Sequence, residues 1–254
     1  LKYSTDGGSN YNGTISNSEL SGNGTFTWTV PDVYSANPTL LYNQMKVRVY
    51  YNAYTMDNSS GNFYITPKFT VTRPTAISVF NVDDTENITW TTDGSVDKVQ
   101  LYYSSDGGTN WTMIDTDPNP YLNNGTYAWY IPNSLSNTTK VRVASYYDNA
   151  TAEAQTDSAN FRIKGKINLI TPALGENLTV DDPYLIQWDP HGTIGNFNIT
   201  YADNGANFND TVATNVAGTS IAWPTGVPDK IGTGKKLRVI STLYDDVYIT
   251  SLAF

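Results

Sequence analysis

The sequence predicts an all-β protein made of antiparallel β-sandwich domains in tandem. Apolar and polar residues alternate in short stretches such as Lys98–Tyr103 and Asn196–Tyr201, which is typical of half-buried strands. Asp-Gly-Gly and Asn-Gly clusters separate these stretches and favour tight turns. The sequence also repeats itself about every hundred residues, which is the size of a β-sandwich and is too long for a solenoid repeat.

Three landmarks define the repeat, and they recur in the same order: a turn motif, a segment that ends in tryptophan, and a basic strand. The matching segments are Tyr3–Tyr11, Tyr103–Trp111 and Tyr201–Phe208 for the turn, Asn23–Trp28, Asn124–Trp129 and Ala217–Trp223 for the tryptophan, and Lys46–Val49, Lys140–Val143 and Lys236–Val239 for the basic strand. Each copy is therefore expected to contain the same series of strands.

The copies differ in how much of the repeat they contain. Trp90 and Trp188 occupy an early strand of their copies, whereas the first copy has no counterpart because Leu1 already matches Leu101. We predict a partial domain without its first strands over 1–67, a complete domain over 68–165 and a nearly complete domain over 166–254. We also expect the chain to be a segment of a longer polypeptide, unless another chain supplies the missing strands.

Composition excludes several classes of function. The chain has 254 residues, no cysteine, one histidine and a formal net charge of -9. Disulfide scaffolds, thiolate metal sites, cysteine nucleophiles and histidine-rich metal centres are therefore excluded. The acidic balance argues against a nucleic-acid partner, and no apolar run approaches the roughly 18 to 20 residues that span a membrane.

The recurring tryptophans and arginines have structural interpretations. A tryptophan ring at position 90 or 188 fills the space between two packed sheets, and the tryptophans that recur before a proline suit core or edge packing better than sugar stacking. These are Trp28, Trp129 and Trp223. Arg48, Arg142 and Arg238 have apolar neighbours on both sides, so we expect them to point outward and to form cross-strand ion pairs or solvated surface rather than an anion site.

One turn motif is similar to a motif found in enzymes. Ser104-x-Asp106-x-Gly108-x-x-Trp111 fits the Asp-box pattern of sialidase-like propellers, which would make the chain a glycosidase. That interpretation requires an arginine cluster, but three of the five arginines occupy one repeated strand position, and propeller blades recur at roughly 40 to 50 residues. We therefore predict that the box closes a hairpin, and we name no catalytic residue.

Other segments of the repeat carry a resemblance to a known class. The runs Ile88–Gly94, Val99–Gly108 and Tyr127–Pro132 resemble the Ig-like modules of large microbial secreted and surface proteins, and are similar to the Kre9/Knh1-type wall-protein domain. The resemblance extends to all three copies. It implies Ig-like or fibronectin type III-like sandwiches in an extracellular or cell-surface protein that assembles with copies of itself or with neighbouring repeats.

Acceptor motifs for N-glycosylation, Asn-x-Ser/Thr, are about twice as frequent as the roughly five or six expected by chance. They begin at Asn12, Asn23, Asn58, Asn87, Asn110, Asn124, Asn137, Asn149, Asn177, Asn198 and Asn209. Strand alternation places Asn87 and Asn198 on outer faces, where a glycan fits. We expect glycosylation, although Asn-Gly-Thr at Asn12, Asn23 and Asn124 also suits turns.

Two pairs of acidic residues precede the early tryptophan strands. Asp83 and Asp84, like Asp181 and Asp182, lie near expected domain junctions, where Ca²⁺ stiffens some tandem sandwiches. A calcium site needs six to eight oxygen ligands, so further groups such as Asp245, Asp246 or loop carbonyls would have to join them. The alternative is an acidic, solvated loop.

The sequence therefore predicts an architectural, non-enzymatic function: a segment of an extracellular array that builds a surface layer, sheath, filament or stalk. Short linkers at Pro67 and at Lys164–Lys166 set the angles between domains. The alternative is an adhesin or carbohydrate-binding module that uses exposed aromatic rings. Its stacking residues would be Tyr50, Tyr51, Tyr146 and Tyr147.

Overall fold

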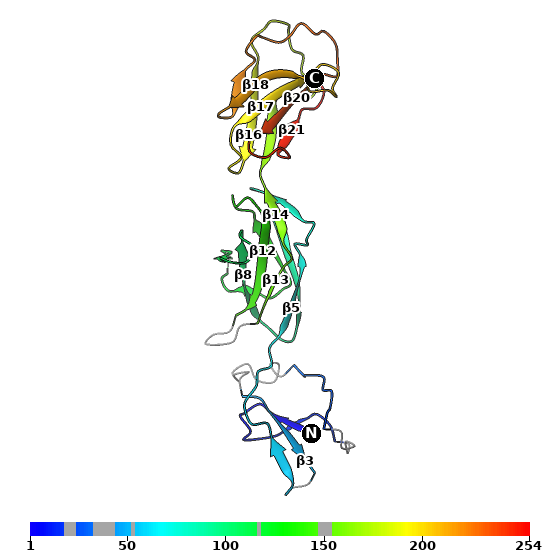
Figure 1. Cartoon of the computed structure of the whole chain (residues 1–254), viewed down its shortest axis with the longest axis vertical. Helices are drawn as coiled ribbons and strands as arrows, with labels where there is room; N and C mark the ends of the chain where they lie inside the picture. The colour runs from blue at the N-terminus through cyan, green and yellow to red at the C-terminus, as the bar shows by residue number, and fades with distance from the viewer. Residues whose placement is uncertain (18–23, 33–43, 52–53, 116–117, 147–153) are drawn as a thin grey trace.

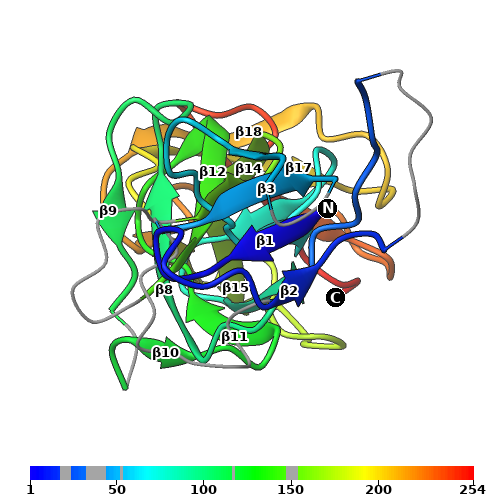
Figure 2. The same ribbon diagram turned by 90° about the horizontal axis from the view of Figure 1, so that it is seen from below.

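A computed structural model describes residues 1–17, 24–32, 44–51, 54–115, 118–146 and 154–254. Every regular element in these residues is a β-strand, as predicted. The strands form three modules in a row along the longest axis of the molecule (Figure 1). Viewed along that axis from below, the modules project onto one another, which shows that they are stacked end to end (Figure 2).

The described part of the first module contains one antiparallel sheet with the strand order β2-β1-β3-β4. Its strands are β1 (Lys2–Ser4), β2 (Gly13–Thr14), β3 (Lys46–Tyr50) and β4 (Met56–Asn58). A second sheet is not found among the described residues of this module.

The second module is a complete sandwich. One sheet has the order β11-β7-β5, with β5 (Lys68–Arg73), β7 (Thr85–Asp93) and β11 (Thr126–Tyr130). The other has the order β10-β8-β12-β14-β6, and β9 and β13 pair with β8 and β12. Its strands are β6 (Val79–Asn81), β8 (Lys98–Ser104), β9 (Thr112–Met113), β10 (Tyr121–Leu122), β12 (Ser136–Ser145), β13 (Gln155–Asp157) and β14 (Phe161–Lys164). The β6–β14 pair is parallel, and it closes this sheet at one edge.

The third module also has two sheets, with orders β15-β16-β19 and β18-β17-β20-β21. The strands are β15 (Lys166–Thr171), β16 (Leu185–His191), β17 (Phe197–Ala202), β18 (Asp210–Val216), β19 (Ser220–Ala222), β20 (Lys236–Ser241) and β21 (Tyr248–Thr250). We name the modules by their strands: β1–β4, β5–β14 and β15–β21.

All three modules pair their central strands in one register. Tyr3 lies opposite Val47, and the matching pairs are Tyr103 with Val141 and Tyr201 with Leu237. The inward residues of these strands join two buried apolar clusters, one in the second module and one in the third. The repeat seen in the sequence therefore corresponds to the same pairing of central strands in each module.

The tryptophans occupy the predicted core positions. Trp90 and Trp188 are buried between the sheets, and so are Trp129 and Trp223. Trp28 in the first module is half-buried and packs against Tyr3 with a ring separation of 5.5 Å. The prediction of structural rather than sugar-stacking tryptophans is confirmed for the buried rings.

Candidate functional site: the junctions between modules

The second and third modules are joined with almost no linker. Strand β14 ends at Lys164 and β15 begins at Lys166, so Gly165 alone separates them. A Cβ atom at Gly165 would lie 2.2 Å from Cγ2 of Ile194 and 2.7 Å from the carbonyl oxygen of His191. A glycine is needed here because the third module packs directly against this backbone.

Two hydrogen bonds connect the loops of the second and third modules that face each other at the junction. The backbone N–H of Thr193 donates to Oδ1 of Asn133 at 2.9 Å, and Nδ2 of Asn133 donates to Oγ1 of Thr193 at 2.8 Å. Leu135 packs against the buried clusters of both modules. The junction therefore combines a two-point polar contact with shared apolar packing.

Two ion pairs also connect the second and third modules, one from β15 and one from β14. Lys166 of β15 pairs with Asp84 of the second module. Arg162 of β14 pairs with both carboxylate oxygens of Asp246, and the Nη2–Oδ1 distance is 2.9 Å. These side chains are 25% to 43% exposed, so each pair contributes about 0–1 kcal/mol, and their joint effect is to fix orientation.

His191, the one histidine of the chain, completes the contact. Its Nδ1 lies 2.8 Å from Oδ2 of Asp83, and its Nε2 lies 3.1 Å from Oδ2 of Asp189. The hydroxyl of Tyr130 donates to Oδ1 of Asp83 at 2.8 Å. The hydrogen bond from His191, together with that from Tyr130, lowers the pKa of Asp83 below 3.8. Lys166 lowers the pKa of Asp84 in the same way, so both carboxylates stay ionised at neutral pH.

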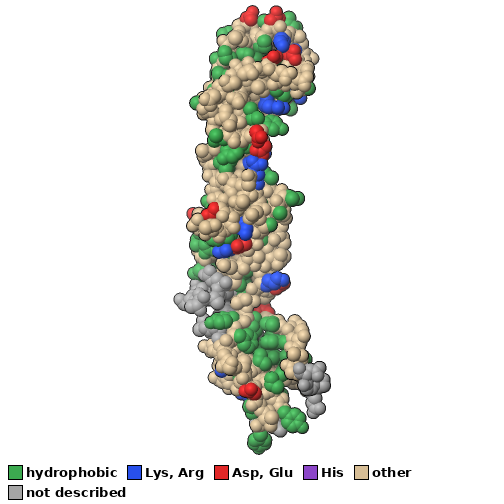
Figure 3. All heavy atoms as spheres, viewed as in Figure 1, with side chains coloured by type: hydrophobic (Ala, Val, Ile, Leu, Met, Phe, Trp, Pro, Cys, Tyr) green, Lys and Arg blue, Asp and Glu red, His purple; other side chains and the backbone are tan. Residues whose placement is uncertain are grey.

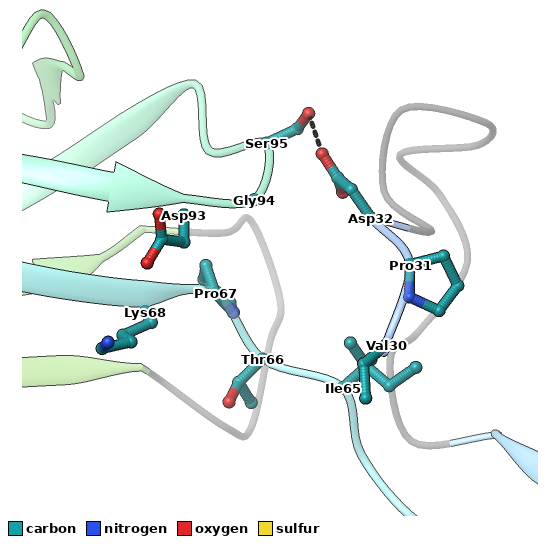
Figure 4. Close-up of a pocket in the computed structure, with 10 residues that line it drawn as sticks. All are labelled: Val30, Pro31, Asp32, Ile65, Thr66, Pro67, Lys68, Asp93, Gly94 and Ser95. Carbon is teal, nitrogen blue, oxygen red and sulfur yellow. Dashed lines mark hydrogen bonds between the residues drawn. The ribbon is translucent and has the colours of Figure 1, made fainter. Parts of the chain in front are cut away.

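The junction between the first and second modules repeats one of these contacts (Figure 4). Asp32 accepts a hydrogen bond from the hydroxyl of Ser95 at 2.6 Å. When the sequence repeats are aligned, Asp32 matches Asn133 and Ser95 matches Thr193. The two junctions therefore use the same loops, with an aspartate–serine pair in one and an asparagine–threonine pair in the other. Sequence analysis missed this contact. The signal that could have found it is the similarity of two equivalent segments, Val30-Pro31-Asp32 and Ile131-Pro132-Asn133.

The acidic pairs form a recurring turn. Asp83 and Asp181 have φ angles of 66° and 63°, and their N–H groups donate to the carbonyls of Ile131 and Val227. At the junction the carboxylates of Asp83 and Asp84 contact cationic or imidazole groups, whereas Asp181 and Asp182 are exposed on the third module. Among the described residues no group of three or more His, Cys, Asp or Glu side chains is arranged to hold a metal ion. Calcium binding stays a prediction.

The Asp-box motif closes a turn, as predicted. Oγ of Ser104 accepts from the N–H of Gly108 at 2.9 Å, and Oδ1 of Asp106 accepts from the N–H groups of Thr109 and Asn110 at 3.0 and 2.9 Å. The side chain of Asn110 also donates to Asp106 at 2.6 Å, a contact that the motif alone did not reveal. The turn in the first module has the same arrangement around Asp6.

The repeated arginines stack on the aromatic residue that ends each turn. The guanidinium carbon lies 3.7 Å from the ring centre of Tyr11 for Arg48, 3.9 Å from Trp111 for Arg142 and 4.0 Å from Phe208 for Arg238. Arg142 also forms the predicted cross-strand ion pair, with Asp157. Such stacks contribute about 0.5–1 kcal/mol at exposed sites, and they tie each turn to its sheet. Sequence analysis missed the stacks because arginine and ring lie about thirty residues apart or more.

The turn carboxylates give a pH prediction. Hydrogen bonds from the N–H of Asn10 and the hydroxyl of Ser4 lower the pKa of Asp6 from 3.8 to about 2. Because the folded-state pKa is lowered, the stabilisation is complete above 3.8 and is lost as the pH falls through about 2. An NMR titration of the Asp6 carboxyl carbon should show a midpoint near pH 2, and Ser4→Ala should move it toward 3.8. A midpoint near 3.8 in the unmodified chain would contradict this assignment.

The glycosylation motifs lie at the surface. The asparagine is exposed at Asn12, Asn58, Asn87, Asn110, Asn124, Asn137, Asn177 and Asn209, and half-buried at Asn198. Asn23 and Asn149 lie outside the described residues. The amide nitrogen of Asn110 is engaged with Asp106, and the side-chain oxygen of Asn198 accepts the N–H of Asn215 at 2.9 Å.

The tyrosines proposed for ligand stacking are divided between modules. Tyr50 and Tyr51 are exposed on the first module, and Tyr146 is half-buried on the second. Tyr147 lies outside the described residues. The structure does not bring the first-module pair and Tyr146 together on one described sheet.

No protein-family model matches the chain, and no curated protein matches it. Similar solved structures include fibronectin(III)-like modules of Clostridium thermocellum CbhA, with 14% identity over 73% of this chain and 90% of that chain and a TM-score of 0.25. A three-Ig segment of titin has 12% identity, coverages of 82% and 71%, and a TM-score of 0.31. The FN1–FN3 domains of chicken CNTN1 have 14% identity, coverages of 83% and 74%, and a TM-score of 0.24. Each of these structures contains Ig or fibronectin type III domains in series. Among the described residues no helix is long and apolar enough to cross a membrane.

Proposed function

We propose that this chain is an architectural segment of an extracellular array, in which sandwiches are held in line so that the protein spans distance in a surface layer, sheath, filament or stalk. The observation that carries the proposal is the direct passage of β14 into β15 through Gly165, with contacts on several sides of it. A binding module on a flexible tether needs no such fixed junction.

The repeated loop contact supports the same proposal. Asp32–Ser95 and Asn133–Thr193 use equivalent positions, so one device orients successive modules. Ion pairs between the modules help to fix their relative orientation, because Lys166 and Arg162 each contact an acidic side chain across the junction. The partners that suit this function are copies of the chain or neighbouring repeats.

A distance measurement tests whether the junction is fixed. The chain has no cysteine, so spin labels can be attached through Ala128→Cys and Ala222→Cys, two exposed alanines on equivalent strands of the second and third modules. Pulsed electron paramagnetic resonance should give one narrow distance distribution. Adding Arg162→Gln and Asn133→Ala should broaden it at least twofold, because the bidentate ion pair and the two-point hydrogen bond are lost together.

The control is an ion pair that lies within one module. Arg73 pairs with Glu86 within the second module, so Arg73→Gln should leave the distribution unchanged. A broad distribution in the unmodified protein would contradict the architectural proposal, and so would equal broadening by Arg73→Gln.

Glycosylation and the extracellular location form a separate part of the proposal. It is supported by the excess of acceptor motifs and by the exposure of eight of the nine described asparagines. Glycopeptide mass spectrometry of the native protein should find sugar on Asn87 and on further exposed motifs. Eleven bare motifs would contradict this part while leaving the junction measurement intact.

A further inference from the structure

The repeated arginines of the second and third modules differ in the acceptor that their guanidinium groups contact. In the second module, Nε and Nη2 of Arg142 donate to the two carboxylate oxygens of Asp157 at 2.6 and 3.0 Å. In the third module Thr250 occupies the strand position of Asp157, and its hydroxyl accepts from Nε of Arg238 at 3.3 Å. Among the described residues no carboxylate forms an ion pair with Arg238. The third module therefore lacks the carboxylate that the second module places on this arginine.

The other arginines of the chain have stronger acceptors than Arg238 has. In the first module Nε of Arg48 donates to the amide oxygen of Asn58 at 2.8 Å. Arg73 and Arg162, outside the repeated position, each pair with a carboxylate. The chain has 24 acidic and 15 basic residues, and its charged side chains form small separate groups on the visible surface (Figure 3). A guanidinium whose acceptor is a single hydroxyl is thus an exception in an acidic protein.

Two aromatic rings hold the guanidinium of Arg238. Its carbon lies 4.0 Å from the ring centre of Phe208 and 5.0 Å from that of Tyr248. The second module has no counterpart of the second ring, because Gln155 takes the strand position of Tyr248. Stacking restricts the orientation of the guanidinium, whose planar fork binds a carboxylate through two parallel hydrogen bonds. The Tyr248 ring is 51% exposed, so it is accessible to a ligand on the guanidinium.

Threonines lie beside Arg238 across the sheet. Thr200 of β17 and Thr250 of β21 are directly opposite it, and Thr211 of β18 lies beyond Thr200. Residues directly opposite one another on neighbouring strands share a face of the sheet, so this face presents hydroxyl groups on both sides of the guanidinium. A hydroxyl both donates and accepts hydrogen bonds, which suits the hydroxyl groups of a sugar.

We propose that the outer face of the third module around Arg238 binds a carboxylated sugar. The guanidinium takes the carboxylate in the way that Arg142 holds Asp157, the Tyr248 ring contacts the sugar ring, and the flanking threonines bond to its hydroxyl groups. A single exposed ion pair binds weakly, so the ring and the hydroxyl groups favour a sugar acid over an acidic side chain. The site uses no junction residue, and the proposal goes beyond the architectural function.

An NMR titration of the whole chain with trigalacturonate, a linear trimer of a sugar acid, tests the proposal. We expect saturable shifts of the Nε–H signal of Arg238 and of the backbone N–H signals of Thr200 and Thr250. The methyl ester of the same trimer keeps the sugar rings without the charge, and it should bind about tenfold more weakly. Absence of saturable shifts in β17, β20 and β21 would overturn the proposal. Triglutamate represents an acidic protein segment, and binding of this peptide as tight as that of trigalacturonate would also overturn it.

One variant transfers the carboxylate of the second module to the third. Thr250→Asp places on Arg238 the group that Asp157 gives to Arg142, so it should weaken trigalacturonate binding about tenfold or more. Hydrogen exchange in β20 and β21 should stay slow, which shows that the sheet is intact. The control is Arg73→Gln, which removes a positive charge elsewhere and should leave binding unchanged. Unchanged binding by Thr250→Asp, or an equal loss in Arg73→Gln, would overturn the proposal.

The reverse transfer should create a second site. Asp157→Thr combined with Gln155→Tyr gives Arg142 the neighbours that Arg238 has, and its guanidinium already stacks on Trp111 at 3.9 Å. We expect new saturable shifts in β8, β12 and β13 and two trimers bound per chain. A chain that keeps slow exchange in β12 and β13 but gains no second site would overturn the proposal.

Discussion

Trp188→Ala is expected to lower the free energy of unfolding of the third module by about 3–5 kcal/mol, because it removes a large buried ring and leaves a cavity. The ring is 0% exposed and packs edge-on against Phe197 at 5.4 Å. Hydrogen exchange in β16, β17 and β20, followed by mass spectrometry, reports the third module separately from the second. A loss below about 1 kcal/mol would show that the ring is not part of a close-packed core.

A matched pair of conservative variants sharpens this prediction. The indole N–H of Trp90 donates to Oδ1 of Asn123 at 2.8 Å, whereas the buried N–H of Trp188 has no hydrogen-bond partner among the described residues. Trp90→Phe breaks a partly buried hydrogen bond, whereas Trp188→Phe removes a buried donor that makes none among the described residues. We expect Trp90→Phe to cost about 1 kcal/mol more than Trp188→Phe, each measured in its own module. The reverse order would contradict these hydrogen-bond assignments.

Gly165→Ala is expected to force the second and third modules apart. The new Cβ atom would lie 2.2 Å from Cγ2 of Ile194 and 2.7 Å from the carbonyl of His191, and the carbonyl belongs to backbone that cannot rotate away. Overpacking of this kind costs about 1–3 kcal/mol, which exceeds the contribution of any one exposed ion pair at the junction. The spin-label distance between the modules should broaden or lengthen, and exchange should accelerate at the N–H of Thr193.

Gly61 provides the control for this variant. An added Cβ there meets no atom within 4 Å, so Gly61→Ala should change neither the distance distribution nor exchange at the junction. An unchanged junction in Gly165→Ala would mean that the modules are not packed against the connecting residue.

The fold was predictable from the sequence because its signals are local or periodic. Alternation along Lys98–Tyr103 identifies β8, and the spacing from Trp90 to Trp188 aligns two cores. The contacts at the junction were harder to predict from the sequence. Asn133 and Thr193 are 60 residues apart, and neither side chain has a property that identifies the other as its partner. Alignment of the repeats matches Asn133 with Asp32 and Thr193 with Ser95. This match predicts a contact in one junction only when the contact in the other junction is already known.

The acidic pairs show a second limit of sequence reasoning. Asp83 and Asp84 lie at a junction, but residue type alone does not show which groups contact them. The contacts come from Lys166 and His191, which tertiary packing brings to them from the next module. The acid pair of the third module lies at the equivalent turn, where Asp181 and Asp182 are exposed.

The passage of β14 into β15 has a mechanical consequence. Tension along the molecule enters the second module at the start of β5 and leaves it at the end of β14, which lie at opposite ends of that sandwich (Figure 1). Strand β14 is bonded on one side to β6 in parallel and on the other to β12. The pull therefore runs along these strands and shears their hydrogen bonds together instead of opening them one at a time. A row of such modules resists stretching through its backbone pairing, and the contacts around Gly165 direct the pull along the strands.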